Sequence, residues 1–382
     1  MTSVAIVRSR SSCPSVNKIA KSLSENGYQV DVIVWDRQRR MSCSSVGGYK
    51  ISRFDFSAPQ DRVAALPFLP MWWLFVLVSL VKKKPEIIHA CDLDTLPPAI
   101  LAKLLVRATL CYSIYDFYAG HLPDGPPIAL RNAIRKSIAF VEKAGIEFAE
   151  ILFLPDEKRS EQVEGARIKE VVYLFNTPPE TYLTNKHNDH GVKSVLTLFY
   201  AGNLDKSRGL EYVVQAVREM NGVSLILAGI GPEKDFICHL ISTNPTRIRY
   251  LGQIPYEKVI EYTEESSALA AFYDPSTENN RYASPNKLFE AMMCGKPIIM
   301  NSEISSARIV KEENCGLLVP YGDVPALKRA IGLLRDDEKL RETLGMNGRN
   351  AYNRKYSYSI VEGKLLDAYE RVSARLSKRG SN

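Results

Sequence analysis

The sequence has little cysteine and histidine, and neither is arranged for a disulfide framework or a structural zinc site. Its seven cysteines are an odd number with no C-x-x-C pair, and its five histidines do not cluster with them. Disulfide frameworks and zinc sites need paired or clustered ligands. We therefore expect reduced thiols, as in a cytoplasmic protein, and no metal site.

Long hydrophobic runs are also scarce. The apolar start of the chain ends at Arg8, so it predicts a first strand rather than a signal peptide. The longest apolar run, Leu66 to Val81, falls short of the ~20 residues of a spanning helix, and three lysines follow it at 82–84. Two interpretations stay open: a helix buried against a sheet, or a helix lying in a membrane face with Trp72 and Trp73 at the interface.

No G-x-G-x-x-G motif opens either half of the chain, which argues against a dinucleotide-dependent oxidoreductase. The 382 residues, 45% hydrophobic and 24% charged, have the composition of a soluble globular protein with two domains. The net charge of +7 suits an anionic ligand such as a nucleotide diphosphate, an acidic membrane surface or nucleic acid. Nucleic acid has only this charge in its favour, so we do not expect it as a partner.

Short β-rich runs alternate with amphipathic stretches in both halves. In the first half, strands are expected at 4–7, 30–35, 87–90 and 110–115, with helices at 16–26, 70–81 and 96–106. In the second half, strands are expected at 195–200, 224–228, 249–251, 268–272 and 297–300, with helices at 209–219, 232–242, 256–264, 285–294 and 324–335. This alternation predicts the α/β class: two doubly wound Rossmann-like domains that face each other across a cleft, with ligands at the carboxyl ends of the strands.

A double proline marks the expected domain boundary. Pro178 and Pro179 precede a polar run that ends at Gly191, a composition typical of a linker. We predict an N-terminal domain at 1–178, a linker at 179–193 and a C-terminal domain at 194–355.

The segment SPNKLFEAMMCGKP, at 284–297, predicts a short helix with defined ends. Ser284 is a good N-cap, and Pro285 is favoured at the first helical position. Gly295 suits the C-terminal stop. A helix of about three turns is therefore expected to begin at Pro285.

The start of this helix is a candidate anion site. The amides of Asn286 and Lys287 have no partner within the helix, and the helix dipole favours a negative charge there. Glu290 lies further along the helix, and because helical side chains lean toward the N-terminus, its carboxylate can meet the hydroxyls of a ligand bound at that end. Taken alone, the same segment also fits a capped surface helix.

Glycine turns follow three of the expected strands in the second half. Gly202 stands at the first turn, followed by Arg208, whose planar cation suits a diphosphate. Gly229 stands in the second turn, and Gly252 and Gln253 form the third. Each turn alone fits an ordinary loop, but together they lie at the edge where a nucleotide is expected.

In this order and spacing, the motifs resemble the C-terminal domain of glycosyltransferase family four, which has the GT-B fold. The resemblance covers residues 195–320 and extends weakly into the last helix. In this fold that helix crosses back to the first domain, so we assign residues 356–382 to it. The N-terminal half resembles the family more loosely and is expected to be the acceptor side.

The resemblance implies roles for individual residues. Two are expected to be catalytic: Arg208, which neutralises the leaving diphosphate, and Glu290, which matches the second acid of the family motif and binds the donor ribose. The implied donor-binding residues are Gly202, Arg208, Gly229, Gly252, Gln253, Asn286, Lys287 and Glu290.

Two departures from the family pattern concern the sugar and phosphate ends of the donor. The first acid of the motif falls at Tyr282, and Glu278 or Asp274 is a nearby carboxylate that can substitute. The family's other phosphate-binding arginine is missing, and Lys206 or Lys287 is expected to supply its charge.

The resemblance implies a retaining, metal-independent transfer of a sugar from a nucleotide-diphosphate sugar to a hydroxyl acceptor. The donor is a substrate, so no cofactor is expected. The acceptor is expected to be a sugar, a polysaccharide precursor or a lipid-linked molecule. Asp92 and Asp116 are acceptor-side candidates that also fit structural turns. The apolar run, its lysines and the basic residues at 131, 135 and 136 suggest peripheral contact with the cytoplasmic membrane face.

Two other functions fit the same architecture. A non-catalytic subunit that binds a nucleotide sugar is consistent with the missing first acid. A nucleotide-sugar epimerase would need a pair of acid and base residues, which the motifs do not supply. Turnover of the donor distinguishes an enzyme from a binding subunit.

Overall fold

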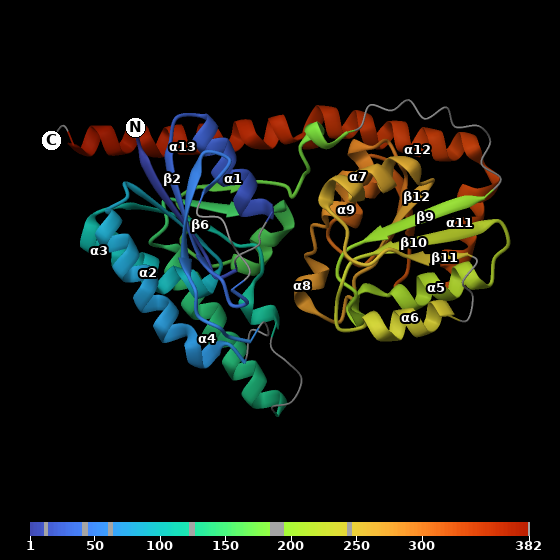
Figure 1. Ribbon diagram of the computed structural model, residues 1–382, viewed down its shortest axis with the longest axis horizontal. Helices are drawn as coiled ribbons and strands as arrows, with labels where there is room; N and C mark the ends of the chain where they lie inside the picture. Colours follow the sequence, from blue (N-terminus) through green and yellow to red (C-terminus); the bar gives the residue numbers. More distant parts are fainter. Residues whose placement is uncertain are drawn as a thin grey trace. The chain divides into compact units, whose positions relative to one another are not determined.

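The chain folds into two α/β units, each built on a parallel sheet with helices on both faces (Figure 1). The computed structural model describes residues 1–10, 14–39, 45–59, 64–121, 127–183, 195–242 and 247–380. The N-terminal unit comprises Met1–Phe175 together with Glu362–Asn382, and the C-terminal unit comprises Asn176–Val361. Most of the predicted linker, residues 184–193, lies outside the described residues.

The sheet of the N-terminal unit has the strand order β3-β4-β2-β1-β5-β6-β7-β8. Every neighbouring pair is parallel except β3 and β4. The strand order reverses between β1 and β5, which is where doubly wound sheets open a crevice. The strands are β1 (Ser3–Arg8), β2 (Gln29–Trp35), β3 (Ser45–Val46), β4 (Tyr49–Phe54), β5 (Ile87–Cys91), β6 (Thr109–Ser113), β7 (Ile151–Leu154) and β8 (Val171–Tyr173).

The helices of this unit cover the two faces of its sheet. One core cluster holds Trp72 of α2 (Leu69–Lys83), Ala99 of α3 (Leu96–Val106) and Ile146 of α4 (Ile128–Ile146). The opposite cluster holds residues of α1 (Pro14–Glu25) and of α13 (Tyr358–Gly380). Helices α2, α3 and α4 therefore share one face, and α1 and α13 share the other (Figure 1).

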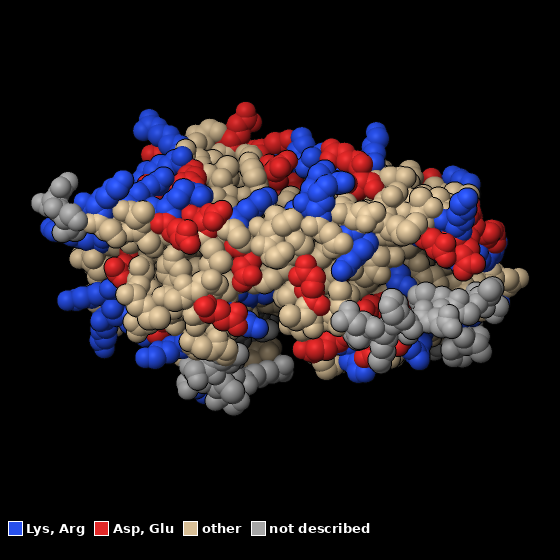
Figure 2. Space-filling model, turned by 90° about the horizontal axis from the view of Figure 1, so that it is seen from above, with Lys and Arg blue, Asp and Glu red and all other residues tan. Residues whose placement is uncertain are grey.

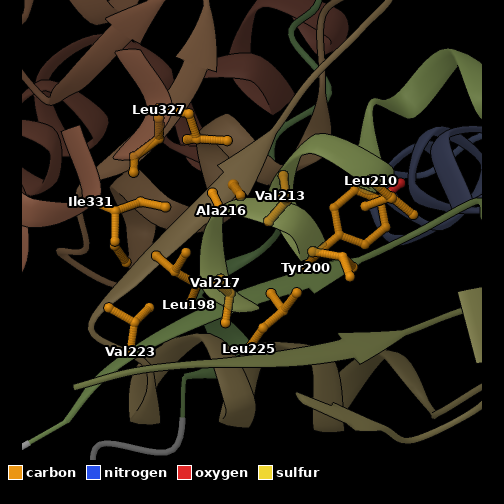
Figure 3. Packing of buried hydrophobic residues seen from close by; sticks show 14 of the residues in the cluster. Leu198, Tyr200, Leu210, Val213, Ala216, Val217, Val223, Leu225, Leu327 and Ile331 are labelled. Carbon is orange, nitrogen blue, oxygen red and sulfur yellow. The ribbon is translucent and has the colours of Figure 1, made fainter. Parts of the chain in front are cut away.

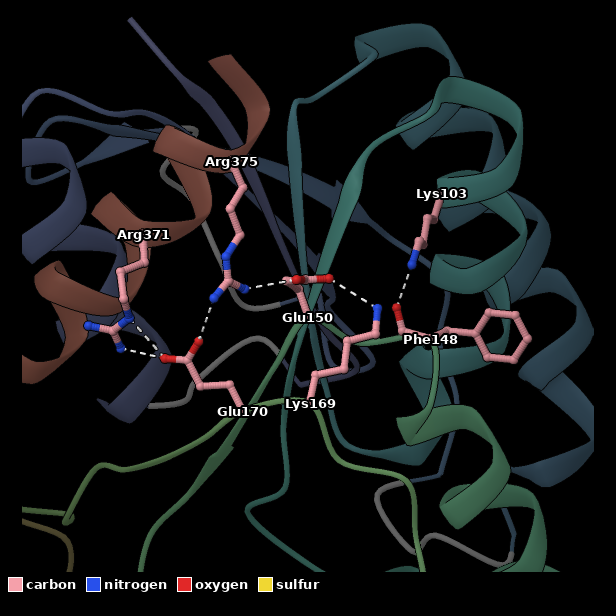
Figure 4. Close-up of polar contacts among 7 residues, drawn as sticks. All are labelled: Lys103, Phe148, Glu150, Lys169, Glu170, Arg371 and Arg375. Carbon is pink, nitrogen blue, oxygen red and sulfur yellow. Dashed lines mark hydrogen bonds and ion pairs between the residues drawn. The ribbon is translucent and has the colours of Figure 1, made fainter. Parts of the chain in front are cut away.

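Helix α13 is attached to the N-terminal sheet by a buried polar contact and by surface ion pairs. His89 of β5 lies between the hydroxyls of Tyr369 and Ser113, each 2.6 Å from a ring nitrogen. Burial lowers the pKa of His89 to about 3, so the ring is neutral. Arg371 and Arg375 pair with carboxylates that follow α4 and precede β8 (Figure 4).

The sheet of the C-terminal unit has the strand order β11-β10-β9-β12-β13-β14, and its order reverses between β9 and β12. Its core joins β9 and β10 to α5 and α11 through aliphatic side chains such as Leu198, Val213 and Ile331 (Figure 3). The strands are β9 (Leu196–Ala201), β10 (Val223–Ala228), β11 (Ile248–Tyr250), β12 (Ala268–Ala271), β13 (Ile298–Asn301) and β14 (Gly316–Val319). The helices are α5 (Leu210–Arg218), α6 (Lys234–Ser242), α7 (Tyr256–Glu265), α8 (Glu278–Arg281), α9 (Asn286–Met293), α10 (Ala307–Glu312), α11 (Val324–Asp336) and α12 (Glu338–Ala351).

The apolar run in the N-terminal half forms a helical stretch from Leu66 to Lys83. Among the described residues, it is the one stretch long and apolar enough to cross a membrane, judged by length and composition alone. At 18 residues it reaches the lower part of the spanning range, so the expectation that it falls short was too strict. Only 17% of the stretch is buried.

Candidate active site

The three predicted glycine turns meet at the carboxyl edge of the C-terminal sheet. Gly202 follows β9, Gly229 follows β10 and Gly252 follows β11. The amide of Gly202 donates to the carbonyl of Ala228 at 3.0 Å, and the amide of Gly229 donates to the carbonyl of Gly252 at 2.7 Å. The turns therefore form one continuous backbone edge next to the point where the strand order reverses.

At two of these glycines, the Cβ atom of any other residue would collide with neighbouring atoms. A Cβ atom at Gly229 would lie 1.8 Å from the carbonyl oxygen of Gly202. A Cβ atom at Gly202 would lie 2.7 Å from the Nζ atom of Lys287. Gly252 meets nothing within 4 Å but has φ +70°, which favours glycine. Gln253, beside it, is exposed.

Helix α9 begins beside these turns, one residue later than predicted. Pro285 is the N-cap, with ψ 134°, and no side chain caps the helix, so the predicted capping role of Ser284 was wrong. The extended backbone of Pro285 stops the helix from starting there. The helix runs from Asn286 to Met293, and Gly295 has the positive φ expected of a helix stop. Asn286 is exposed at the open amino end of the helix, whereas Lys287 is buried.

Two cations lie at this edge, each against an aromatic ring. The buried ammonium of Lys287 lies 4.4 Å from the centroid of Tyr200, at the end of β9. The guanidinium of Arg208 lies 4.3 Å from the centroid of Tyr273, which follows β12. Its Nη1 atom also donates to Asn280 at 3.4 Å. The two cations are close enough for their charges to interact, and like charges held together in a low dielectric favour an anion between them.

Lys206 faces a different environment, although the sequence could not distinguish it from Lys287. Its side chain is exposed and lines a cavity of about 160 Å³ together with Asp205, Glu211 and Glu233. Burial, helped by the charge of Glu233, raises the pKa of Glu211. Lys206 therefore meets the three carboxylates of this cavity, while Lys287 meets aromatic rings and the charges of Glu290 and Arg208.

Glu290 is held by a tyrosine that the sequence analysis did not single out. The carboxylate is 4% exposed, and its Oε1 atom accepts a 2.9 Å hydrogen bond from the hydroxyl of Tyr256 at the start of α7. Tyr256 in turn packs edge-on against Tyr182, with ring centroids 5.1 Å apart. Burial, and then the nearby charge of Glu290, raise the pKa of the Tyr256 hydroxyl, so it remains a donor.

The loop before α9 carries the candidates for the missing acid. The Oδ1 atom of Asp274 accepts the amide of Ser276 at 2.9 Å, so this carboxylate stabilises its own turn. Glu278 begins α8, and Tyr282 is its half-buried C-cap residue. Asn280 links the two parts of the site, because its side chain contacts Arg208 and also donates to the carbonyl of Asp274.

The acceptor-side candidates belong to the N-terminal unit. Asp92 is 2% exposed and has φ 65° and ψ 166°, a backbone region that non-glycine residues rarely adopt. Its Oδ1 atom accepts the amides of Tyr115 and Asp116, and its Oδ2 atom pairs with buried Arg8. Asp116 is half-buried. Both Asp92 oxygens thus serve the structure at the point where this strand order reverses.

The tyrosines and Asn280 are the parts of the site that sequence reasoning missed. Tyr200 and Tyr273 each stand at the carboxyl end of a strand that flanks the reversal, between β9 and β12. That position was a usable signal, since ligands bind outside such strand ends. No comparable signal marks Tyr256, whose partner lies 34 residues away on another helix. Among the described residues, no group of three or more His, Cys, Asp or Glu side chains could hold a metal ion.

Comparison with known proteins shows that this edge is similar to a known family. The model of the family described as "Glycosyl transferases group 1" matches residues 184–351, which include every residue of the site described above apart from Tyr182 and those of the N-terminal unit. Residues 184–351 are thus similar to the group 1 glycosyltransferases.

Individual relatives are distant. The lipopolysaccharide core biosynthesis glycosyltransferase LpsD of Rhizobium meliloti is 26% identical over 176 residues, which are 46% of this chain and 49% of that protein. The phosphatidyl-myo-inositol mannosyltransferase of Mycobacterium leprae is 27% identical over 195 residues, 48% of each chain. The matched regions thus span about half the length of these two relatives.

A solved structure extends the likeness to the whole fold. The sucrose-phosphate synthase of Thermosynechococcus elongatus superposes with a TM-score of 0.80 at 18% identity, over 98% of this chain and 100% of that one. The two Rossmann-like units are therefore those of the GT-B fold, as the sequence predicted.

Proposed function

We propose that the protein is a retaining glycosyltransferase that moves a sugar from a nucleotide-diphosphate sugar to a hydroxyl acceptor without a metal ion. The observation that supports this most directly is the pair of cations, Lys287 and Arg208, at the start of α9. Glu290 lies one turn further along the same helix, oriented by Tyr256. A diphosphate beside the cations and a ribose diol at Glu290 match this arrangement.

The proposed reaction breaks the bond between the anomeric carbon and the diphosphate oxygen and forms a bond from that carbon to the acceptor oxygen. The acceptor proton passes to the leaving diphosphate on the same face of the sugar, so the configuration is retained. Negative charge grows on the diphosphate as it leaves. Arg208, Lys287 and the first amides of α9 stabilise that charge through positions that are fixed before the reaction.

We further propose that the acceptor is a lipid-linked molecule or a polysaccharide precursor, and that the protein acts at the cytoplasmic face of a membrane. The names of two relatives support this, because they refer to lipopolysaccharide core biosynthesis and to phosphatidyl-myo-inositol. Asp92 and Asp116 stand at the carboxyl edge of the N-terminal sheet. That edge is the expected place for an acceptor in a doubly wound unit.

Replacement of Arg208 tests the proposed function. We expect Arg208→Ala to lower the rate of sugar transfer by ~100-fold or more, as the loss of one preorganised donor does in other enzymes. Donor hydrolysis and transfer are followed with UDP-, GDP- and ADP-linked sugars, and nuclear magnetic resonance reports the anomeric configuration of the product. Transfer by the variant at the wild-type rate, or an inverted product, would contradict the proposal.

A non-catalytic subunit that binds a nucleotide sugar is the second candidate. The observation in its favour is Tyr282, which occupies the position of the first motif acid. The same assay separates the two candidates. Calorimetric binding of a nucleoside diphosphate without turnover of any donor sugar would support the binding subunit.

A further inference from the structure

Among the residues that the structure describes, most of the large exposed apolar side chains lie on three helices of the N-terminal unit. Helix α2 exposes Met71, Leu74 and Val78, which follow one another at helical spacing along a single stripe. The other members of this surface are Leu101, Leu104 and Leu105 on α3, and Ile128, Leu130, Ile134, Phe140 and Val141 on α4. Leu74, Leu104 and Phe140 are 63%, 62% and 73% exposed.

The exposed stripes of the three helices point away from the same sheet face. The inner side of α2 packs on that face through Trp72, Val76 and Leu80, all fully buried. Ala99 of α3 and Ile146 of α4 belong to the same core cluster. Since the inner sides of these helices meet one core, their outer sides together form one surface of the unit, which we call the α2–α4 face (Figure 1).

Within these three helices, the described residues include no exposed acidic side chain, and Glu147 stands exposed just after α4. Helices α2 and α3 contain no Asp or Glu, and the single Glu of α4, Glu142, is buried. Lys82, Lys84 and Arg107 stand exposed at the carboxyl ends of α2 and α3. By contrast, the side of the molecule on which α13 lies mixes acidic and basic side chains (Figure 2).

We propose that the α2–α4 face docks on an anionic lipid bilayer. Apolar side chains enter the boundary between headgroups and acyl chains, and the cations at the helix ends contact lipid phosphates. A surface of exposed apolar residues with no exposed acidic side chain within its three helices, and with basic side chains at the ends of α2 and α3, matches this partner in both chemistry and charge. The proposal deepens the proposed function, because it places a lipid-linked acceptor on the N-terminal unit, but docking itself is measured without turnover.

The geometry favours a helix that lies on the bilayer over one that spans it. Trp72, Val76 and Leu80 form part of the core that holds α2 on the sheet, and Trp72 stacks on Trp35 with ring centroids 5.7 Å apart. Spanning would pull these side chains out of the core. Docking uses the opposite stripe of α2 and leaves the core intact.

Vesicle flotation tests the proposal with the full-length protein. We expect binding to phosphatidylcholine vesicles that contain phosphatidylglycerol, much weaker binding to phosphatidylcholine alone, and a loss of binding at high salt. The apolar variant Leu74→Glu with Leu104→Glu, and the charge variant Lys82→Glu with Lys84→Glu, should each lower the partition coefficient by about tenfold or more. All four side chains are exposed, so the substitutions do not enter the core.

The controls place the same changes on the C-terminal unit. Leu333→Glu with Met346→Glu replaces two apolar side chains that are 55% and 59% exposed, and Lys234→Glu with Lys339→Glu reverses two exposed lysines. We expect these variants to bind vesicles like the wild type. Equal binding to neutral and anionic vesicles, no binding to either, or unchanged binding of the α2–α4 variants would overturn the proposal.

Two further results distinguish this inference from others. A dimer in the absence of lipid that Leu74→Glu with Leu104→Glu converts to a monomer would show that a second copy of the chain covers the face, and would also overturn it. Calorimetry with a nucleoside diphosphate runs in parallel. Normal nucleotide binding by a protein that does not float would disprove docking and leave the proposed function in place.

Discussion

At the scale of single residues, Lys287 and Lys206 show that burial distinguishes a lysine expected to bind phosphate from one that is not. Both are lysines near the expected phosphate site, and the sequence could not separate them. The structure buries Lys287 over Tyr200 with Arg208 nearby, whereas Lys206 is exposed and faces carboxylates. A buried ammonium carries a desolvation cost, which the charge of Glu290 and a bound anion both offset.

We therefore expect unequal effects from the two lysines. Lys287→Met should weaken the binding of a nucleoside diphosphate roughly 10- to 100-fold, the range of one charge-assisted hydrogen bond. Lys206→Met should weaken it less than about threefold, as for an exposed charge. Titration calorimetry measures the affinity of both variants. Equal losses of affinity, or a larger loss for Lys206→Met, would refute the assignment of Lys287 as the phosphate-binding cation beside Arg208.

Tyr256 gives a second prediction at the residue scale. Its hydroxyl fixes one oxygen of Glu290, so removal should misplace the carboxylate that is proposed to hold the ribose. We expect Tyr256→Phe to weaken nucleoside diphosphate binding roughly fivefold, in line with one hydrogen bond. The effect should shrink with a 2′,3′-dideoxy ligand, which lacks the ribose diol.

Tyr262 supplies the matched control on the same helix. Its ring packs on Phe199, and no hydrogen bond of its hydroxyl is found among the described residues. Tyr262→Phe should leave affinity unchanged, and Glu290→Ala should exceed the loss seen for Tyr256→Phe. A loss for Tyr256→Phe that is the same with and without the ribose hydroxyls would show that Tyr256 does not act through Glu290.

At the scale of elements, the junction of β6 and α4 depends on one protonated carboxyl. Glu142 of α4 accepts a 2.7 Å hydrogen bond from Tyr112 of β6 and is fully buried. Burial raises its pKa to about 8, and the charge of Asp92 adds to this, against the opposing effect of the Tyr112 hydroxyl. Below that pH the group is neutral and fits its apolar surroundings.

The raised pKa has a consequence for stability. The folded protein binds a proton that the unfolded chain releases near its ordinary pKa of 4.5, so this contribution to stability is full below pH 4.5 and is lost as pH rises to about 8. We expect Glu142→Gln, which cannot ionise, to gain on the order of 2 kcal/mol over the wild type between pH 6 and pH 9.

The measurement is urea unfolding followed by tryptophan fluorescence. All three tryptophans, Trp35, Trp72 and Trp73, belong to the N-terminal unit that contains Glu142. A difference between variant and wild type that stays constant from pH 6 to pH 9 would show that Glu142 does not ionise in this range.

The strands also show which local sequence signals are sufficient to predict an element. Strands β1, β2, β5 and β9 lie within about two residues of their expected positions, because each is a short apolar run bounded by polar or glycine residues. Strands β3, β4, β7, β8 and β14 were missed. The sequence pattern of three of them is weak, because buried and exposed side chains alternate irregularly in β4, and β7 and β8 have only four and three residues. Pairing with neighbouring strands, rather than local sequence, places these segments in the sheet.

The candidate site also contains some residues that local sequence signals indicated and others that only the structure shows. The turns at its glycines and the helix that carries Glu290 were predicted from local signals, whereas the roles of Arg208 and Glu290 came from the family resemblance and stay predictions. The choice of Lys287 over Lys206 and the role of Tyr256 were not predicted, because each depends on contacts between segments far apart in the chain. Ser284 was misplaced as a cap because the backbone of Pro285 is extended.

At the scale of the whole molecule, the two units share a plan and differ in what occupies the point of strand reversal. In the C-terminal unit, that point carries glycine turns and cations that leave room for a ligand. In the N-terminal unit it carries the buried pair of Arg8 and Asp92, whose oxygens are engaged by the protein. At the point of strand reversal, the polar side chains of the N-terminal sheet are therefore engaged in contacts within the protein, whereas the C-terminal sheet leaves room for a ligand.

This contrast predicts that stability and nucleotide binding respond to different variants. Asp92→Asn removes the charge that compensates Arg8, a buried partner, and should lower the stability of the N-terminal unit by about 3–5 kcal/mol. Nucleoside diphosphate affinity should change less than about twofold, because the residues proposed to bind it all belong to the C-terminal unit and Asp92 does not. Tryptophan fluorescence in urea measures the first effect, and calorimetry measures the second.

Glu290→Ala should give the opposite pattern, with weak nucleotide binding and an unchanged tryptophan transition, because Glu290 lies in the unit without tryptophan. If folded Asp92→Asn protein loses nucleotide affinity, then Asp92 contributes to the donor site and the division of roles between the units is wrong. If it keeps that affinity but loses sugar transfer beyond its loss of folded protein, then the edge at Asp92 serves the acceptor, as the sequence suggested.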